Sequence, residues 1–269
     1  MKNLGISIIF LFLITFNISA QKIVYSFNES YEINPIVSIQ VQTFEGSIEV
    51  LSNDKSSIEV FYSVKKDDKL VNLTKLEFDQ HFNLIVIHER NKFEIKVELK
   101  PEEKKKYWKE NIQVSLLIQV PKETASDLTT MKGNISIKGL IANQKCNTSD
   151  GNIEAEKIKG NSIFETSNGN IIFKDLSGSV VSTTPNGKIQ GNIKAVKDSL
   201  VMMSENGSIN VIVPGGLGFD LLLKGKLVNT SLSKFTGTSQ RTFVKGRLNG
   251  GGLPVRMISN TGNVSLFFN

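Results

Sequence analysis

The feature that most constrains the fold is a short repeat in the second half of the 269-residue chain. Glycines recur every 18 residues from Gly133 to Gly187, and the next glycine follows after 20. A polar residue and then Ile or Val follow each glycine, and a threonine or serine stands three residues before it. The glycines that fit this template are Gly46, Gly133, Gly151, Gly169, Gly187, Gly207 and Gly262.

Each copy predicts a tight turn followed by a short strand. Asn168-Gly169 is typical of a turn, because Gly adopts positive φ freely and Asn tolerates it. Ile171 and Phe173 then alternate with other residues, so one face of the strand is buried. A second strand follows in the same unit, for example at 162–166 or 179–183. We therefore interpret the repeat glycines, namely Gly133, Gly151, Gly169, Gly187, Gly207 and Gly262, as structural turn residues.

One unit of about 18 residues cannot bury its own apolar face, but stacked units can. Parallel strands about 4.8 Å apart, each paired with its equivalent in the next coil, would form a β-solenoid. Its core would contain an inward ladder of Ile135, Ile153, Ile171, Ile189 and Ile209. Antiparallel hairpins joined by Asn-Gly turns are the alternative. The nearly constant spacing favours coils.

The chain as a whole is predicted to be all-β, a single-stranded β-solenoid preceded by an irregular β-rich N-terminal half. No long stretch has helical periodicity. After residue 213 a Pro-Gly-Gly segment ends the repeat, and the template that returns at Gly262 is expected to cap the stack. The predicted division is a signal peptide at 1–20, the N-terminal half at 21–120, the repeat at 121–214, and a loop excursion with capping strands at 215–269. Strands in the first half are expected at 37–41, 48–51, 58–64, 84–88, 93–99 and 112–120.

The first 20 residues predict export. Lys2 precedes an apolar run from Ile6 to Phe16, which is too short for a bilayer core of about 30 Å but typical of a signal peptide. We expect cleavage after Ala20 and a mature chain in the periplasm or at the cell surface. No cysteine ends the apolar run, so an N-terminal lipid anchor is not expected. No later stretch is apolar enough for a transmembrane segment.

Charge and cysteine content narrow the possible functions. The formal net charge is +6, but the lysines are spread along the chain apart from the run Lys104–Lys106, which is typical of a solvated turn. Nucleic acid is therefore not an expected partner. Cys146 is the only cysteine, so an internal disulfide is impossible. We interpret it as a small buried residue; a catalytic thiol would need a nearby histidine base.

The candidate catalytic and metal-binding residues do not form a recognised site. His81 and His88 are separated by an odd number, which on one strand puts them on opposite faces. Glu154 and Glu156 share a strand face at a spacing near that of glycosidase carboxylates. No acidic column extends this pair in neighbouring coils. We predict no cofactor, no metal and no enzymatic activity.

The polar residues of the repeat are the remaining candidates. Asn134, Asn152 and Asn170 would form a column with one residue per coil. One interpretation is a structural ladder in which the amides hydrogen-bond one another. The other is a polar strip that binds a ligand, with a preference for anionic polymers because of the basic excess.

The order of these features resembles the bacterial putative-adhesin family, also described as the auto-transporter adhesin head (GIN) domain. The resemblance rests on the strand closed by Val120-Pro121, the Thr-x-x-Gly-Asn-Ile units from Thr130, and the late Asn249-Gly-Gly-Gly before Gly262-Asn-Val. It implies an exported β-solenoid and adhesion, and it supplies no catalytic residues.

The expected function is thus a non-enzymatic binding module that contacts an envelope or extracellular glycan or protein. One alternative is a structural or regulatory envelope protein that docks a protein partner, for instance through 215–258. A more distant alternative is a polysaccharide-acting enzyme that depends on Glu154.

Overall fold

The structure is a computed structural model that describes residues 26–32, 38–101 and 111–269. The expected signal peptide at 1–20 and the run Lys104–Lys106 lie outside the described residues. The described part is mostly β with one short helix. Its first elements are β1 (Phe27–Glu32), β2 (Ser38–Glu45), β3 (Ile48–Asn53), β4 (Ser57–Lys66), β5 (Lys69–Val71), α1 (Lys75–His81), β6 (Phe82–Glu89), β7 (Lys92–Leu99) and β8 (Ile112–Pro121).

The remaining elements are all strands. The repeat contains β9 (Ala125–Lys132), β10 (Ile135–Lys138), β11 (Gln144–Asp150), β12 (Ile153–Glu156), β13 (Ser162–Asn168), β14 (Ile171–Thr184), β15 (Ile189–Ser204) and β16 (Ile209–Val213). The C-terminal part contains β17 (Phe219–Lys224), β18 (Val228–Thr230), β19 (Phe235–Gln240), β20 (Phe243–Leu248), β21 (Leu253–Ser259) and β22 (Val264–Phe268).

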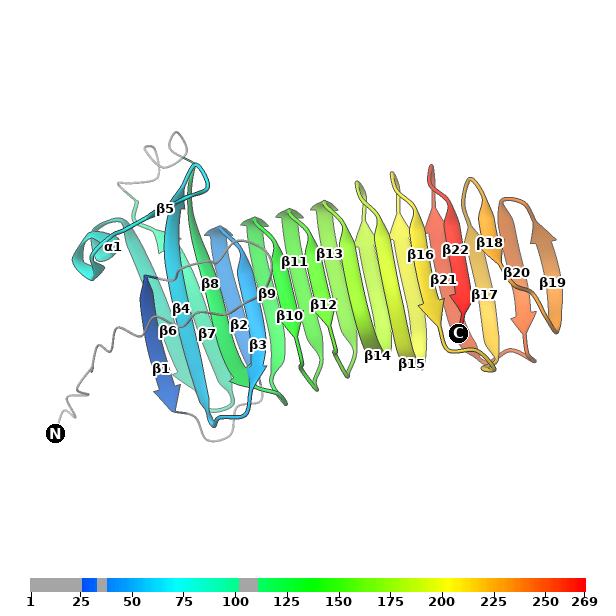
Figure 1. Cartoon of the computed structure of the whole chain (residues 1–269), viewed down its shortest axis with the longest axis horizontal. Helices are drawn as coiled ribbons and strands as arrows, with labels where there is room; N and C mark the ends of the chain where they lie inside the picture. The colour runs from blue at the N-terminus through cyan, green and yellow to red at the C-terminus, as the bar shows by residue number, and fades with distance from the viewer. Residues whose placement is uncertain (1–25, 33–37, 102–110) are drawn as a thin grey trace.

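Strands of the repeat pair in parallel with the equivalent strand one unit later. On one face β9, β11, β13 and the second half of β14 follow one another; on the other face β10, β12 and the first half of β14 do so. Ile135 lies opposite Ile153, and Thr148 lies opposite Thr166. The strands therefore form one long row (Figure 1). The hairpin alternative is wrong for the repeat, because these pairings are parallel.

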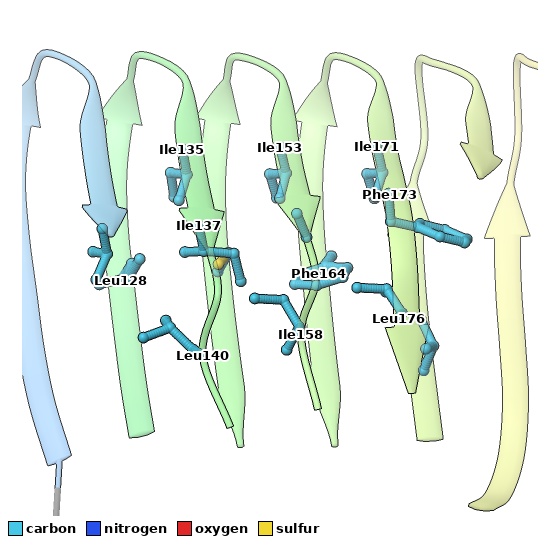
Figure 2. Packing of buried hydrophobic residues seen from close by; sticks show 14 of the residues in the cluster. Leu128, Ile135, Ile137, Leu140, Ile153, Ile158, Phe164, Ile171, Phe173 and Leu176 are labelled. Carbon is cyan, nitrogen blue, oxygen red and sulfur yellow. The ribbon is translucent and has the colours of Figure 1, made fainter. Parts of the chain in front are cut away.

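The core runs along the inside of this row. Ile135, Ile153 and Ile171 occupy equivalent positions in successive units and are fully buried, as expected. Figure 2 shows them one beside the next, with Ile158 and Leu176 forming a second row below. Ile189 and Ile209 continue the first row. Each of these apolar side chains lies beside the equivalent side chain of the next unit. The repeat spacing therefore sets how successive strands align with one another.

The repeat glycines sit where neighbouring chains come very close. A Cβ added to Gly169 would lie 2.0 Å from the carbonyl oxygen of Gly151, and one added to Gly187 would lie 1.8 Å from that of Gly169. Gly46 and Gly133 also have positive φ, at 135° and 151°, but φ of the later repeat glycines lies outside that region. The requirement shared by the column is therefore close approach, which differs from the turn conformation that we expected.

The hydroxyl three residues before each glycine links adjacent units. Thr148 Oγ1 donates to the carbonyl oxygen of Gly133 at 3.0 Å, and Thr166 Oγ1 donates to that of Gly151 at 2.8 Å. The same bond is formed by Thr130, Thr184, Ser204 and Ser259. These hydroxyls are buried. Each hydroxyl therefore supplies a hydrogen-bond donor to a glycine carbonyl oxygen at the corner of the preceding unit.

Part of the N-terminal half continues the same row. β2 and β3 pair in parallel with β9 and β10, with Thr43 opposite Thr130 and Ile48 opposite Ile135. β7 and β8 lie beyond them, and antiparallel β6 and β4 follow. The Gly46 copy is therefore spatially adjacent to the Gly133 copy, although 87 residues separate them in sequence.

The helix α1 corrects the expectation of a chain without helices. Thr74 caps it, since its hydroxyl accepts from the backbone N–H of Glu77 and the Glu77 side chain accepts from the backbone N–H of Thr74. Phe78 is its one buried residue and packs against Phe82 and Tyr62. Seven residues are too few to show a helical period, so this local capping signal was the only one available.

The C-terminal order also differs from expectation. β21 and β22 pair with β15 and β16, with Ser259 opposite Ser204 and Val264 opposite Ile209. β17 and β18 then pair with β21 and β22, and antiparallel β20 and β19 follow. In Figure 1 the red strands accordingly lie between the yellow and the orange ones. The copy at Gly262 is therefore internal, and the preceding excursion covers the end instead.

Candidate functional site

The predicted asparagine column exists, but its hydrogen bonds differ from those expected. Asn134 Oδ1 accepts from the backbone N–H of Asn152 at 2.8 Å, and Asn152 Oδ1 accepts from that of Asn170 at 2.8 Å. Asn170 Oδ1 accepts from the backbone N–H of Lys188 at 2.9 Å. Each amide oxygen therefore stabilises the next unit's backbone. The proposed contact of this column with a ligand remains a prediction.

A second polar column forms the amide ladder that we expected at the first. Asn168 Nδ2 donates to Asp150 Oδ1 at 2.7 Å, and Asn186 Nδ2 donates to Asn168 Oδ1 at 3.0 Å. Asn206 Nδ2 donates to Asn186 Oδ1 at 2.9 Å. All four residues are exposed. The sequence signal for this column is the Asp or Asn directly before Gly151, Gly169, Gly187 and Gly207. Such a residue is also typical of a turn, so by itself it does not predict a ladder.

The two carboxylates of β12 have unequal surroundings. Glu154 is exposed and lies opposite Ser136 and Ile172, as expected. Glu156 forms an ion pair with Lys138 at 2.9 Å, and the hydrogen bond in this pair holds the pKa of Glu156 below its usual range. A general acid needs a raised pKa, so Glu156 is suited to pairing with lysine rather than to proton donation at neutral pH.

The histidines do not come together as a pair. His81 ends α1, whereas His88 is exposed on β6 and contacts the ring of Phe93. Within the described ranges, no group of three or more His, Cys, Asp or Glu side chains is placed to hold a metal ion.

Cys146 is buried in the middle of the row, which confirms its interpretation as a packing residue. It lies between Leu128 and Phe164 of the neighbouring strands. Burial raises the pKa of its thiol, and the charge of Asp127 raises it further. The thiol therefore stays protonated and shielded at neutral pH.

Charged side chains are few on the outer face of the middle strands β9, β11 and β13, and they differ in sign. Lys145 forms an ion pair with Asp127 of the adjacent strand at 3.4 Å. Asn147 Nδ2 donates to Glu165 Oε2 at 3.3 Å. The middle of this face therefore has little net charge.

The same outer face changes character at β21, β17 and β20. Arg256, Lys224, Lys245 and Arg247 are exposed there and lie on the side opposite to the buried Val255, Leu223 and Val244. Asp220 pairs with Arg247 at 3.8 Å. Among the described residues, no carboxylate is within ion-pair distance of the other three basic side chains. Basic charge is thus concentrated on this face.

Comparison with known proteins finds distant similarity in structure but not in sequence. No protein-family model matches the sequence, and no curated protein is significantly similar. The crystal structure of a putative cell adhesion protein from Clostridium sporogenes ATCC 15579 matches 90% of this chain and 99% of that chain, at 10% identity and a TM-score of 0.30. This similarity assigns no family to the chain, so the expected resemblance to the putative-adhesin family stays a prediction. None of the helices in the described part is long and apolar enough to cross a membrane.

Proposed function

We propose that this chain is an exported, non-enzymatic binding protein of the bacterial cell envelope, with an adhesin-like role. Its stacked units form a β-solenoid in this proposal, and the outer faces of the strands contact glycan or protein. The observation that supports the proposal most is the parallel register, which repeats across β9, β11, β13 and β14. It produces a long face on which outward side chains of successive strands stand in rows, one at each strand spacing of about 4.8 Å.

Such a face suits an extended ligand better than a small one. A small-molecule site is a concave pocket with a few converging polar groups. The exposed groups here are instead arranged in rows, for example the ladder from Asp150 to Asn206. A polymer can contact several rows at once, so weak individual contacts add up along its length.

Co-sedimentation of the purified chain with isolated bacterial envelope fractions, at low and high salt, tests this proposal. Retention that persists at high salt supports a specific binding protein, because general charge attraction is screened there. Retention that disappears at high salt would assign the binding to charge attraction, and variants at individual basic residues then decide whether net charge alone is responsible. Absence of retention from every fraction would favour the alternative of docking to a soluble protein.

Enzymatic action on a polysaccharide can be tested separately from binding, by measuring product release. Release of soluble products from envelope glycans, together with its loss in Glu154→Gln, would contradict the non-enzymatic assignment. The matched control is Glu165→Gln, since Glu165 is also an exposed carboxylate on an outer strand face.

A further inference from the structure

The excess of basic over acidic residues in this protein lies at its C-terminal end. Residues 214–269 contain seven basic residues and one acidic residue, and the other 213 positions contain 25 of each. The net charge of +6 for the whole chain therefore equals that of these last 56 residues. The basic residues are Lys224, Lys226, Lys234, Arg241, Lys245, Arg247 and Arg256.

The strand pairing gathers four of these side chains on one face. Leu222 of β17 lies opposite Arg256 of β21 on one side and opposite Lys245 of β20 on the other. Arg256 and Lys245 are therefore two strand spacings apart, or about 10 Å. Lys224 and Arg247 belong to the same face, because they lie two residues from Leu222 and Lys245 respectively. We call these four residues the basic face.

Other side chains on these strands complete a surface with mixed chemistry. Phe243 lies opposite Lys224 and is half-buried, so part of its ring faces solvent between basic side chains. Thr236, Thr238 and Gln240 of β19 are exposed on the adjoining edge, opposite Arg247, Lys245 and Phe243. The surface thus offers cations, a partly exposed ring and hydrogen-bonding groups next to one another.

We propose that the basic face binds a polyanionic glycan, that is, an extended carbohydrate chain carrying carboxylate or phosphate groups. This inference rests on the proposed function and specifies its ligand class and location. Three basic groups without a carboxylate partner on a flat surface attract a chain of regularly recurring anions. The hydroxyl and amide groups of β19 can hydrogen-bond sugar hydroxyls, and the ring of Phe243 provides an apolar surface for a sugar face.

A glycan fits this face better than a lipid bilayer does. Stable attachment to a bilayer surface requires apolar side chains that insert below the headgroups. Leu222, Ile258 and Phe243 are each half-buried in a flat sheet, so they cannot insert in this way.

The opposite outer face at this end, formed by β16, β22 and β18, has no charged residue within those strands. Binding should therefore be restricted to one side.

Titration of the full chain with polygalacturonate over a salt series tests the inference. In the double variant Lys224→Gln/Lys245→Gln, we expect affinity at low salt to fall about tenfold and the slope of log affinity against log salt to become shallower by about 1.4, or about 0.7 for each lysine. The matched control is Lys188→Gln/Lys197→Gln, which removes the same charge from exposed positions near or on β15. It should change affinity less than about twofold if location matters.

Other probes decide the ligand class. Neutral dextran should not bind, and both phosphatidylglycerol vesicles and random-sequence duplex DNA should bind more weakly than polygalacturonate. Equal loss of affinity in the control variant would overturn the inference, since any lysine would then serve. Tighter binding of vesicles or DNA, or equal binding of dextran, would overturn it as well. All four lysines are exposed, so unchanged thermal unfolding is expected for both variants.

The two proposals can fail separately. Salt-resistant retention on envelope fractions that is unaffected by Lys224→Gln/Lys245→Gln would keep the proposed function and reject the basic face. Binding of polygalacturonate that depends on these lysines, without retention on any envelope fraction, would keep the basic face and reject the envelope role.

Discussion

The middle of the strand row and its C-terminal end differ in what holds them together. In the middle, each unit repeats the last. Each repeat glycine lies close to the glycine one unit away, the hydroxyls donate to glycine carbonyl oxygens of the preceding unit, and the amides of one column bond one another. At the end, β17 to β20 leave this template, include antiparallel pairs, and place basic side chains side by side. Repetition serves stacking, whereas departure from the repeat creates a distinct surface. Substitutions matched between the two regions can test this difference.

Removing part of the row should have the largest effect. Deletion of residues 151–168 joins Asp150 to Gly169 and removes one whole unit, so equivalent positions stay aligned. Repeat arrays have stabilities that are approximately sums over units, and we expect a folded, somewhat less stable chain. Deletion of only residues 160–168 removes β13 and shifts every later strand out of alignment. Circular dichroism and thermal unfolding should show a cooperative transition for the first variant and none for the second.

Equal behaviour of the two deletions would contradict a stack in which the unit is 18 residues. A folded half-unit variant, in particular, would show that the strands do not need equivalent partners.

Adding one methyl group to a repeat glycine should have the next largest effect. The Cβ of Gly169→Ala would lie 2.0 Å from the backbone carbonyl oxygen of Gly151, which belongs to a packed strand corner and cannot move alone. We expect a loss of about 3 kcal/mol or more in the free energy of unfolding. Gly216→Ala at the C-terminal end is the control. Gly216 has a φ of 79° and open space around its Cβ position, so only conformational strain of about 1 kcal/mol is expected.

Denaturant unfolding of both glycine variants measures the difference. Similar losses would mean that backbone conformation, rather than close approach, explains the repeat glycines.

The repeat itself allowed much of this fold to be predicted. Ile135, Ile153 and Ile171 were expected inside because they recur at one offset, and they are buried. The spatial order was not predictable in the same way. The copy at Gly262 lies between the Gly207 copy and β17, because sequence order does not determine the order of stacking.

The candidate surfaces were harder to predict for a similar reason. The threonine before each glycine was visible in the sequence, but its acceptor belongs to another unit. The basic face consists of residues from β17, β20 and β21, whose adjacency depends on long-range pairing. Spacing along the chain shows which residues recur, but it does not show which residue of another strand each one contacts.

Removing a buried hydroxyl should have an intermediate effect. Thr166→Val preserves the shape of a buried side chain but removes the donor to the Gly151 carbonyl oxygen. We expect a loss of about 1–2 kcal/mol in the free energy of unfolding, because the carbonyl oxygen of half-buried Gly151 loses its donor. Thr238→Val at the exposed end should change stability by less than about 0.5 kcal/mol. Equal costs in urea unfolding would remove the special role assigned to the hydroxyl column.

Thiol reactivity should distinguish the two regions without changing stability. Cys146 is fully buried in the middle, and burial raises its thiol pKa, so Ellman's reagent should not react with it until the chain unfolds. In Thr238→Cys, the new thiol lies on an exposed edge strand and should react at least about a hundredfold faster than Cys146. The chain should thus show one fast thiol in buffer and two in denaturant. Fast reaction of Cys146 in buffer would show that the middle of the row opens as readily as its end, and the contrast between a tightly repeated interior and a distinct terminal surface would no longer hold.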